Sequence, residues 1–330
     1  MPVRSLVYLL LCFAIIFLGF SPLGPKGGFN YQTWQGNGFS MESILAAPDF
    51  EDSVTGLPET RKNKTAKKKR KFVRPKRKMN VLFIAVDDLR LQLGCYGNKI
   101  VKSPNIDNLA QDGIVFENAY CQQAVCAPSR ASLLSGLRPD TTGVYDLKTP
   151  LRSVLPEIRT LPQHFKENGY QTISIGKIYH HLQDDPVGWS EPQFRAKALS
   201  YATEESLAIV KTGQYRTHQG GRIGPPFEAP DINDDGYADG KNCEYAIERL
   251  RRLKEESKPF FLAVGFLKPH LPFNAPKKYW DLYDPETLPL ANNPFPPENV
   301  TPYSLTDFGE LRSYYGIPNK VHSLSNSRDN

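Results

Sequence analysis

The chain has 330 residues, of which 40% are hydrophobic and 23% are charged, and its formal net charge is +6. This length allows one large domain or two small ones, and the apolar content allows a sizeable core. Residues 61–78 hold twelve Lys or Arg and no Asp or Glu, so the rest of the chain has a formal charge of −6. The positive net charge therefore comes from one tract, and this uneven distribution argues against a nucleic acid as the partner.

The first twenty residues have the pattern of a secretory signal. An uncharged apolar run, residues 6–20, follows Arg4, which is typical of a signal peptide. The run is short for a membrane span, which takes roughly 20 apolar residues. We therefore predict that residues 1–20 are a signal peptide or an N-terminal anchor. The protein is expected to be exported, whether periplasmic, secreted or anchored to a membrane by this segment.

Residues 21–78 are predicted to form a disordered linker that contains the basic tract at 61–78. Residues 21–60 are rich in Gly, Pro, Ser and polar residues and show no sustained hydrophobic period. We interpret the tract as a solvated tether. Its alternative role is peripheral contact with an anionic surface or a polyanionic glycan.

Apolar runs and amphipathic segments alternate after the tract. A continuous apolar run, residues 81–86, follows Asn80, and it predicts that residues 80–86 form a strand buried on both faces of a parallel sheet. The predicted strands are 80–86, 114–116, 172–177 and 259–266. The predicted helices are 103–110, 126–135, 160–166 and 243–253. Residues 184–236 are rich in loops. This alternation predicts an α/β domain with a mostly parallel central sheet flanked by helices.

The helix predicted to begin at Cys126 carries the motif Cys-x-Pro-x-Arg at 126–130. Pro128 lies in the first turn, where a helix tolerates proline best. Free N–H groups and the helix dipole favour an anion beside Cys126, and Arg130 adds a positive charge one turn further on. The motif therefore predicts a place for chemistry on a sulfate or phosphate group.

Reactive side chains lie at the ends of three of the predicted strands or shortly after them. They are the pair Asp87-Asp88, then Lys177 and His180, and finally Lys268 and His270. Ligand sites in such sheets collect outside the carboxyl ends of the strands. The two carboxylates suit a hard cation such as Ca²⁺ or Mg²⁺, although Asp-Asp is also ordinary turn chemistry. Taken singly, a histidine in such a position is more often satisfied by local hydrogen bonds than catalytic, and Lys177 and Lys268 can be ordinary solvated lysines.

Taken together, these elements resemble the sulfatase family in order and spacing over residues 79–320. The segments that carry the resemblance are Asp-Asp at 87–88, Ser-Pro-Asn-Ile-Asp-Asn-Leu-Ala at 103–110, Cys-Ala-Pro-Ser-Arg at 126–130, Gly-Lys-Ile-Tyr-His at 176–180 and Lys-Pro-His at 268–270. Segments 87–90, 94–97, 122–126, 138–142 and 261–265 are most similar to the iduronate-2-sulfatase branch. The resemblance implies an alkaline phosphatase-like sulfatase fold, of which this chain holds the larger, N-terminal part.

The resemblance also implies a reaction, the hydrolysis of sulfate esters on sulfated sugars. In the family, a formylglycine-generating or anaerobic sulfatase-maturating enzyme oxidises the motif cysteine, here Cys126, to formylglycine. The hydrated aldehyde attacks sulfur, the alcohol leaves, and the second hydroxyl then expels sulfate. One Ca²⁺ per chain stabilises the negative charge that develops.

The resemblance assigns a role to each candidate residue. The metal ligands are Asp87, Asp88 and Cys126. The catalytic residues are Cys126 as the nucleophile, Arg130 as the holder of the hydrate, Lys177 and His270 as the clamp on the sulfate, and His180 as the partner of the hydrate in proton movement. Lys268 ranks below these residues.

Several alternatives stay open. Four cysteines, Cys95, Cys121, Cys126 and Cys243, allow two disulfides in an oxidising compartment, and a bond between Cys121 and Cys126 would exclude formylglycine. A related phosphatase or phosphodiesterase would use Ser or Thr and two metal ions. A non-catalytic protein that binds sulfated glycans is the third alternative.

The end of the sequence bears on these alternatives. The family continues with a second pair of metal ligands and a further sulfate-binding lysine. Residues 321–330 are polar without an apolar period and are predicted to be an unstructured tail. We therefore expect a C-terminally truncated copy, whose activity on its own is in doubt.

Overall fold

The computed structural model describes residues 8–10, 78–180, 183–217, 220–290, 295, 298–301 and 309–318. These residues all fall in one unit, made of residues 1–15 and 77–330. The linker predicted at 21–78, apart from its last residue, and the tail predicted at 321–330 lie outside the described residues. Only residues 8–10 of the predicted signal peptide are described, as a short strand. All of these predictions therefore stay predictions.

The described part of the chain alternates between strands and helices after residue 80. The strands are β1 (Tyr8–Leu10), β2 (Val81–Val86), β3 (Gln171–Gly176), β4 (Phe227–Glu228), β5 (Phe260–Phe266) and β6 (Phe273–Asn274). The α-helices are α1 (Pro104–Asp112), α2 (Cys126–Ser135), α3 (Pro139–Thr142), α4 (Leu151–Val154), α5 (Leu161–Glu167), α6 (Glu204–Thr212), α7 (Ala238–Glu255) and α8 (Lys277–Trp280). Short 3₁₀ turns are η2 (Gly94–Tyr96), η3 (Pro186–Gly188), η4 (Asp234–Gly236), η5 (Pro285–Thr287) and η7 (Leu311–Ser313). Among the described helices, none has the length and apolar character that a membrane crossing requires.

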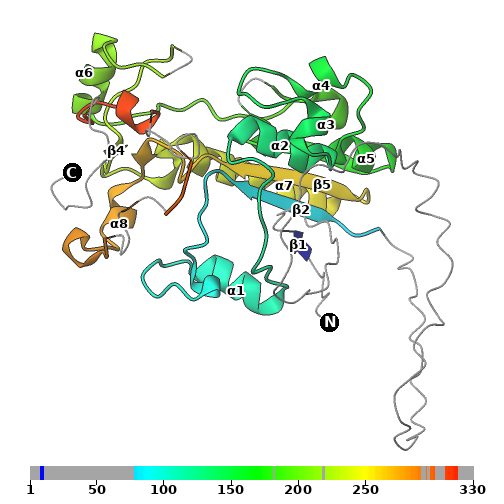
Figure 1. Cartoon of the computed structure of the whole chain (residues 1–330). Helices are drawn as coiled ribbons and strands as arrows, with labels where there is room; N and C mark the ends of the chain where they lie inside the picture. Colours follow the sequence, from blue (N-terminus) through cyan, green and yellow to red (C-terminus); the bar gives the residue numbers. More distant parts are fainter. Residues whose placement is uncertain are drawn as a thin grey trace, which may run out of the picture. The chain divides into compact units, whose positions relative to one another are not determined.

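Four parallel strands form the central sheet in the order β1-β2-β5-β3 (Figure 1). Val86 at the end of β2 pairs with Phe266 at the end of β5, and Gly176 at the end of β3 pairs with Gly265. The three strands therefore end together at one edge of the sheet. Residues that follow them meet at this edge, where ligand sites of parallel sheets form.

Helices cover both faces of the sheet. On one face, Leu134 of α2 packs in a buried cluster with Phe83 of β2 and Phe261 of β5. On the other face, Leu253 of α7 packs in a second cluster with Leu262 of β5. Successive side chains of a strand point to opposite faces, so the continuous apolar run of β5 supplies both clusters. This arrangement confirms the predicted α/β class with a parallel sheet flanked by helices.

Each predicted helix is present, with ends shifted by a few residues. The largest shift is at α7, which begins at Ala238 rather than at 243. The region 184–236 also contains α6, whose start is capped by Thr203 through a hydrogen bond from the Ser206 amide. Composition alone described this region only as rich in loops.

Two strand predictions need correction. The strand predicted at 114–116 is wrong, because these residues form no strand and Ile114 is 82% exposed. A short apolar triplet needs a partner strand to become part of a sheet. Residues 80–86 do contain a strand, but only Phe83 is fully buried and the rest of β2 is half-buried. The covering helices enclose the central strand β5 more completely than its neighbour β2.

Candidate active site

Cys126 is the first residue of α2, and it is half-buried. Val125 before it is extended, and its side chain does not cap the helix. The other end of α2 closes at Gly136, which adopts φ 74° and donates its amide to the Ser132 carbonyl over 2.8 Å. Only glycine adopts this left-handed conformation without steric cost. The N-terminal, partly positive end of α2 therefore lies at Cys126.

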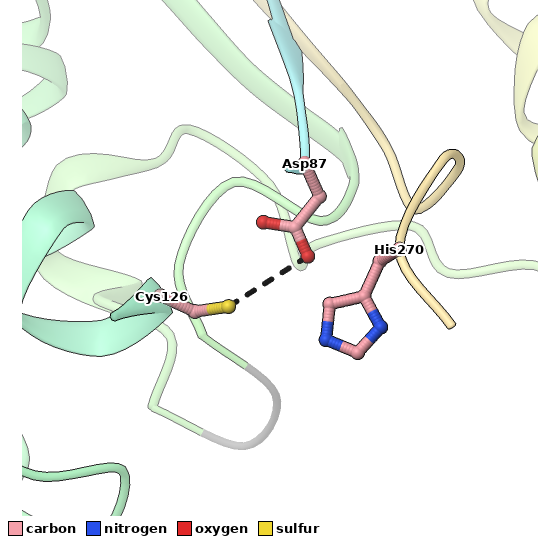
Figure 2. A group of neighbouring side chains, drawn as sticks. All are labelled: Asp87, Cys126 and His270. Carbon is pink, nitrogen blue, oxygen red and sulfur yellow. Dashed lines mark hydrogen bonds between the residues drawn. The ribbon is translucent and has the colours of Figure 1, made fainter. Parts of the chain in front are cut away.

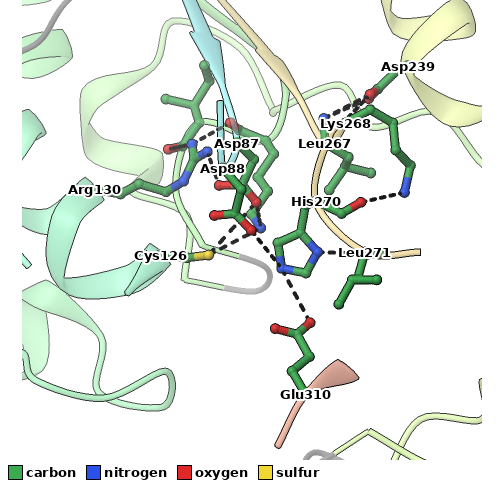
Figure 3. A network of polar contacts seen from close by, with 12 residues as sticks. Asp87, Asp88, Cys126, Arg130, Asp239, Leu267, Lys268, His270, Leu271 and Glu310 are labelled. Atoms are coloured by element: carbon green, nitrogen blue, oxygen red, sulfur yellow. Dashed lines mark hydrogen bonds and ion pairs between the residues drawn. The ribbon is translucent and has the colours of Figure 1, made fainter. Parts of the chain in front are cut away.

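Asp87 lies at the centre of a buried network of charges (Figure 3). Its Oδ1 accepts a hydrogen bond from Arg130 Nη2 over 2.7 Å, and its Oδ2 accepts one from the Lys177 ammonium. Arg130 Nη1 also donates to the carbonyls of Lys177 over 2.6 Å and Ile178 over 2.7 Å. The network joins the ends of β2 and β3 to the first turns of α2.

The charges of this network set the protonation of its members. Burial disfavours the Asp87 carboxylate, but the cations of Arg130 and Lys177 outweigh it, and the pKa of Asp87 is lowered. Burial raises the pKa of the Cys126 thiol, and Asp87 raises it further while Lys177 opposes the rise. Asp87 is therefore ionised at neutral pH, and Cys126 is a protonated thiol with little nucleophilic character.

Three metal-ligating groups meet beside this network, namely Asp87, Cys126 and His270 (Figure 2). One ligand atom from each lies within 4.8 Å of the other two. Asp88 adjoins them, because its Oδ2 lies 3.9 Å from His270 Nε2. A carboxylate has about four lone-pair sites, so Asp87 can accept from two cations and still bind a metal ion. Asp87 and Asp88 therefore offer carboxylate oxygens that suit a divalent cation, with Cys126 and His270 beside them.

The structure brings most of the predicted site residues together. Cys126 Sγ lies 3.8 Å from Asp87 Oδ2 and 3.8 Å from Lys177 Nζ. Asp88 lies on the outer side of the group, with 56% of its side chain exposed. His180 is buried, three residues beyond Lys177, but it is not a member of the metal-ligand group among the described residues.

Sequence reasoning missed Glu310 and ranked Lys268 low. Glu310 Oε1 lies 3.6 Å from His270 Nε2, and nothing in the surrounding sequence marks it. Lys268 is half-buried. Burial lowers its pKa to about 8, with Asp239 opposing this shift and Lys177 adding to it. Its Nζ donates to the carbonyls of His270 and Pro272.

The disulfide alternative finds no support in the described residues. Free thiols occur at Cys95, Cys121, Cys126 and Cys243. The structure therefore contains no bond between Cys121 and Cys126.

Two cavities adjoin the site. A cavity of about 230 Å³ is lined by the end of β2, by residues 120–125 and by the first turns of α2, and it includes Cys126 and Arg130. A second cavity, of about 310 Å³, is lined by Gln122, Gln123, Arg138, Pro139, Asp140 and Tyr145. Gln122 and Gln123 line both cavities, so the two cavities are neighbours.

Comparison with known proteins identifies the family to which this site belongs. Residues 79–319 match the family described as Sulfatase. The chain belongs to the sulfatase family. The iduronate 2-sulfatases of Mus musculus and Homo sapiens are each 42% identical over 240 residues, which are 71% of this chain and 43% of the relative. These matches confirm the predicted family and its similarity to the iduronate-2-sulfatase branch.

Another sulfatase and a solved structure match with lower sequence identity. A sulfatase of Formosa agariphila is 35% identical over 221 residues, which cover 64% of this chain and 43% of the relative. Among solved structures, a phosphonate monoester hydrolase of Agrobacterium radiobacter matches with a TM-score of 0.48 and 26% identity, over 65% of this chain and 46% of that one. The chain spans less than half the length of these sulfatase relatives.

Proposed function

We propose that the protein hydrolyses sulfate esters on sulfated saccharides. The observation that carries this proposal is the convergence of Cys126, Asp87 and Lys177 at one edge of the sheet, inside a sulfatase-family domain. Relatives at 42% identity are named iduronate 2-sulfatase, which favours a sulfated uronic acid or a similar sugar as the substrate.

The proposed nucleophile derives from Cys126. As a half-buried thiol with a raised pKa, the side chain is a weak nucleophile. Oxidation by a formylglycine-generating or anaerobic sulfatase-maturating enzyme would replace it with formylglycine, whose hydrate supplies an oxygen nucleophile. The free state of the thiol and its place at the start of α2 are consistent with a precursor of this kind.

A single Ca²⁺ would be held by Asp87, Asp88 and the side chain at position 126, with His270 beside them. Sulfur and nitrogen are poor ligands for Ca²⁺, so an oxygen at position 126 would improve the donor set. When bound, the cation supplies stabilisation of negative charge on the sulfate and on the attacking oxygen.

The remaining residues bind and orient the substrate. The Lys177 ammonium lies 3.8 Å from Cys126 Sγ, where it can pair with a sulfate oxygen. Arg130 holds both Asp87 and the backbone before His180, so it fixes the walls of the site. His270 Nδ1 lies 2.7 Å from the Leu271 carbonyl, which can only accept, so we assign the proton to Nδ1. A sulfate oxygen can only accept a hydrogen bond, so His270 would bind it through Nε2 as the imidazolium, in which both ring nitrogens carry a proton, and His180 assists proton movement.

The second cavity would hold the rest of the saccharide. It shares the lining residues Gln122 and Gln123 with the cavity beside Cys126. Arg138 is exposed, and its guanidinium can bind a carboxylate or sulfate on a neighbouring sugar in a bidentate manner. Tyr145 offers a ring on which a sugar can stack.

The decisive experiment is maturation followed by mass spectrometry. The chain is expressed with a maturation enzyme, and the peptides that contain Cys126 and Cys121 are compared. We expect an aldehyde at Cys126 and an unmodified thiol at Cys121, together with turnover of 4-methylumbelliferyl sulfate. A thiol at Cys126 after maturation would contradict the proposal. Faster turnover of the aryl phosphate would favour a phosphatase, and binding of sulfated glycans without turnover would favour a non-catalytic role.

Export also remains a proposal. It is predicted from the sequence pattern of residues 1–20, of which the structure describes only residues 8–10. N-terminal sequencing of the secreted or periplasmic protein would test it. A mature N-terminus at Met1 in a cytoplasmic fraction would contradict it.

A further inference from the structure

The segment that follows β5 carries His270, and α7 holds its beginning. Asp239, the second residue of α7, accepts hydrogen bonds from the Leu267 amide over 2.9 Å and from the Lys268 amide over 2.8 Å. A carboxylate in the first turn of a helix is favoured by the helix dipole. The start of the segment is therefore fixed to the covering helix α7, and not only to the sheet.

The Lys268 side chain holds the rest of the segment. Its ammonium donates to the carbonyls of His270 over 3.0 Å and of Pro272. In Figure 3 the side chain extends away from Cys126, on the far side of His270. A half-buried lysine with this direction cannot clamp a sulfate beside Cys126. Its donors are used on the backbone of its own segment instead.

We propose that Lys268 and Asp239 are positioning residues for His270. Asp239 fixes the two amides before His270, and Lys268 fixes the carbonyls of His270 and Pro272. The ring of His270 is thereby directed toward Asp87 and Cys126. Each contact acts on the backbone, so neither residue needs to touch the substrate. This role rests on the proposed function, in which His270 binds the sulfate.

The geometry makes one prediction that a merely stabilising role does not make. If Lys268 acts through His270, its replacement must lose its effect once His270 is itself replaced. Residues coupled in this way give strongly non-additive double mutants, whereas independent sites give additive ones. Loss of residues that orient a functional side chain typically costs about 10- to 100-fold in affinity or activity.

The test combines kinetics with a double-mutant cycle on the matured 330-residue chain. We expect Lys268→Met to lower kcat/KM for 4-methylumbelliferyl sulfate by about tenfold, and by less than about twofold when His270→Gln is already present. Lys268→Arg keeps a cationic donor and should recover part of the activity. Lys278→Met, at an exposed lysine, is the matched control and should behave as the wild type. Equal losses in both backgrounds, or no loss at Lys268→Met, would overturn the inference.

A second measurement keeps the inference separate from the proposed function. In a ¹⁵N-histidine-labelled chain, the His270 signals are assigned with His270→Gln, and the tautomer is read from the two ring nitrogens. In the substrate-free chain, at a pH where the ring is neutral, we expect the Nδ1–H tautomer in the wild type and a loss of this preference in Lys268→Met. If the wild type shows no turnover, the proposed function fails while this spectrum still tests the positioning role. An unchanged His270 spectrum in Lys268→Met would overturn the inference.

Asp239→Asn provides the second variant if Lys268→Met does not fold. An asparagine keeps one accepting oxygen, so the Leu267 and Lys268 amides can keep part of their hydrogen bonding to residue 239. We expect a weaker change in the same direction as for Lys268→Met, in both the His270 spectrum and kcat/KM. A variant with the wild-type spectrum and wild-type kcat/KM would overturn the role of Asp239.

Discussion

Arg130 Nη2 donates a hydrogen bond to Asp87 Oδ1 over 2.7 Å, and both side chains are buried. Arg130 lies one turn into α2, and Asp87 follows the last residue of β2. The pair therefore joins the beginning of a helix to the end of a strand. Because Cys126 lies four residues before Arg130, the same contact keeps the Cys126 thiol opposite the Asp87 carboxylate.

Replacing Arg130 with methionine is expected to destabilise the protein strongly. The buried Asp87 carboxylate would lose its hydrogen bond and ion pair with Arg130 and keep only the ion pair with Lys177. Removing one partner of a buried ion pair costs about 3 to 5 kcal/mol. Urea unfolding of Arg130→Met would measure this loss. Arg252→Met, which removes an exposed pair with Glu248, is the control and should leave the unfolding midpoint almost unchanged. Equal midpoints for both variants would contradict the prediction.

The lowered pKa of Asp87 predicts an acid-dependent loss of stability in metal-free buffer. The unfolded chain has the ordinary aspartate pKa near 3.8, and the folded chain has a lower one, because Arg130 and Lys177 outweigh the effect of burial. The unfolded state therefore takes up the proton first as the pH falls. The contribution of ionised Asp87 is complete above pH 3.8 and is lost below it, as the pH falls through the folded-state pKa.

This pH dependence can be measured as a difference between variants. The free energy of unfolding of the wild type should exceed that of Asp87→Asn by a constant amount above pH 5 or so, and the gap should close at lower pH. Asp281→Asn, at an exposed carboxylate, serves as the control. A gap that stays constant down to the acid unfolding of both proteins would refute the assignment.

Calcium binding is expected to depend on Asp88 although its side chain is 56% exposed. Asp88 supplies a second carboxylate next to Asp87, and its φ of 55° is a conformation that aspartate seldom adopts. Asp88→Asn removes one negative charge from the ligand set and should weaken Ca²⁺ binding by at least about tenfold. Titration calorimetry of the chelator-treated protein would measure this change. Asp281→Asn is again the control, and an Asp88→Asn isotherm equal to that of the wild type would exclude Asp88 as a ligand.

The second cavity predicts a difference between small and large substrates. Arg138→Ala should weaken binding of a sulfated disaccharide by roughly tenfold, because a hydrogen bond to a charged group is lost. The same change should leave KM for 4-methylumbelliferyl sulfate almost unchanged, since the aryl group does not reach a second sugar position. Kinetics with 4-methylumbelliferyl sulfate alone would measure its KM. Inhibition of that activity by the disaccharide would measure the affinity for the disaccharide. A parallel change for the two ligands would place Arg138 in the primary site instead.

The local sequence determined the elements and the reactive residues at their ends. The apolar runs of β2, β3 and β5 and the proline and glycine at the two ends of α2 are local signals, so the strands and the helix were predicted within a residue or two. Similarity of motifs then identified the family. Residues 114–116 show the limit of this reasoning, because an apolar triplet does not reveal whether another strand lies beside it.

Only the tertiary structure decided how the reactive residues are paired. The parallel register of β2, β5 and β3 brings Asp87, Lys177 and His270 to one edge, although they are far apart in the chain. The structure thereby distinguishes two lysines that have a similar sequence context. Lys177 contacts Asp87 and Cys126, whereas the Lys268 side chain bonds to the backbone of its own segment. Hydrogen bonds reach only about 3 Å, so a side chain's partners depend on the packing of distant segments. The sequence alone therefore specified which groups are present, and the fold specified which of them act on one another.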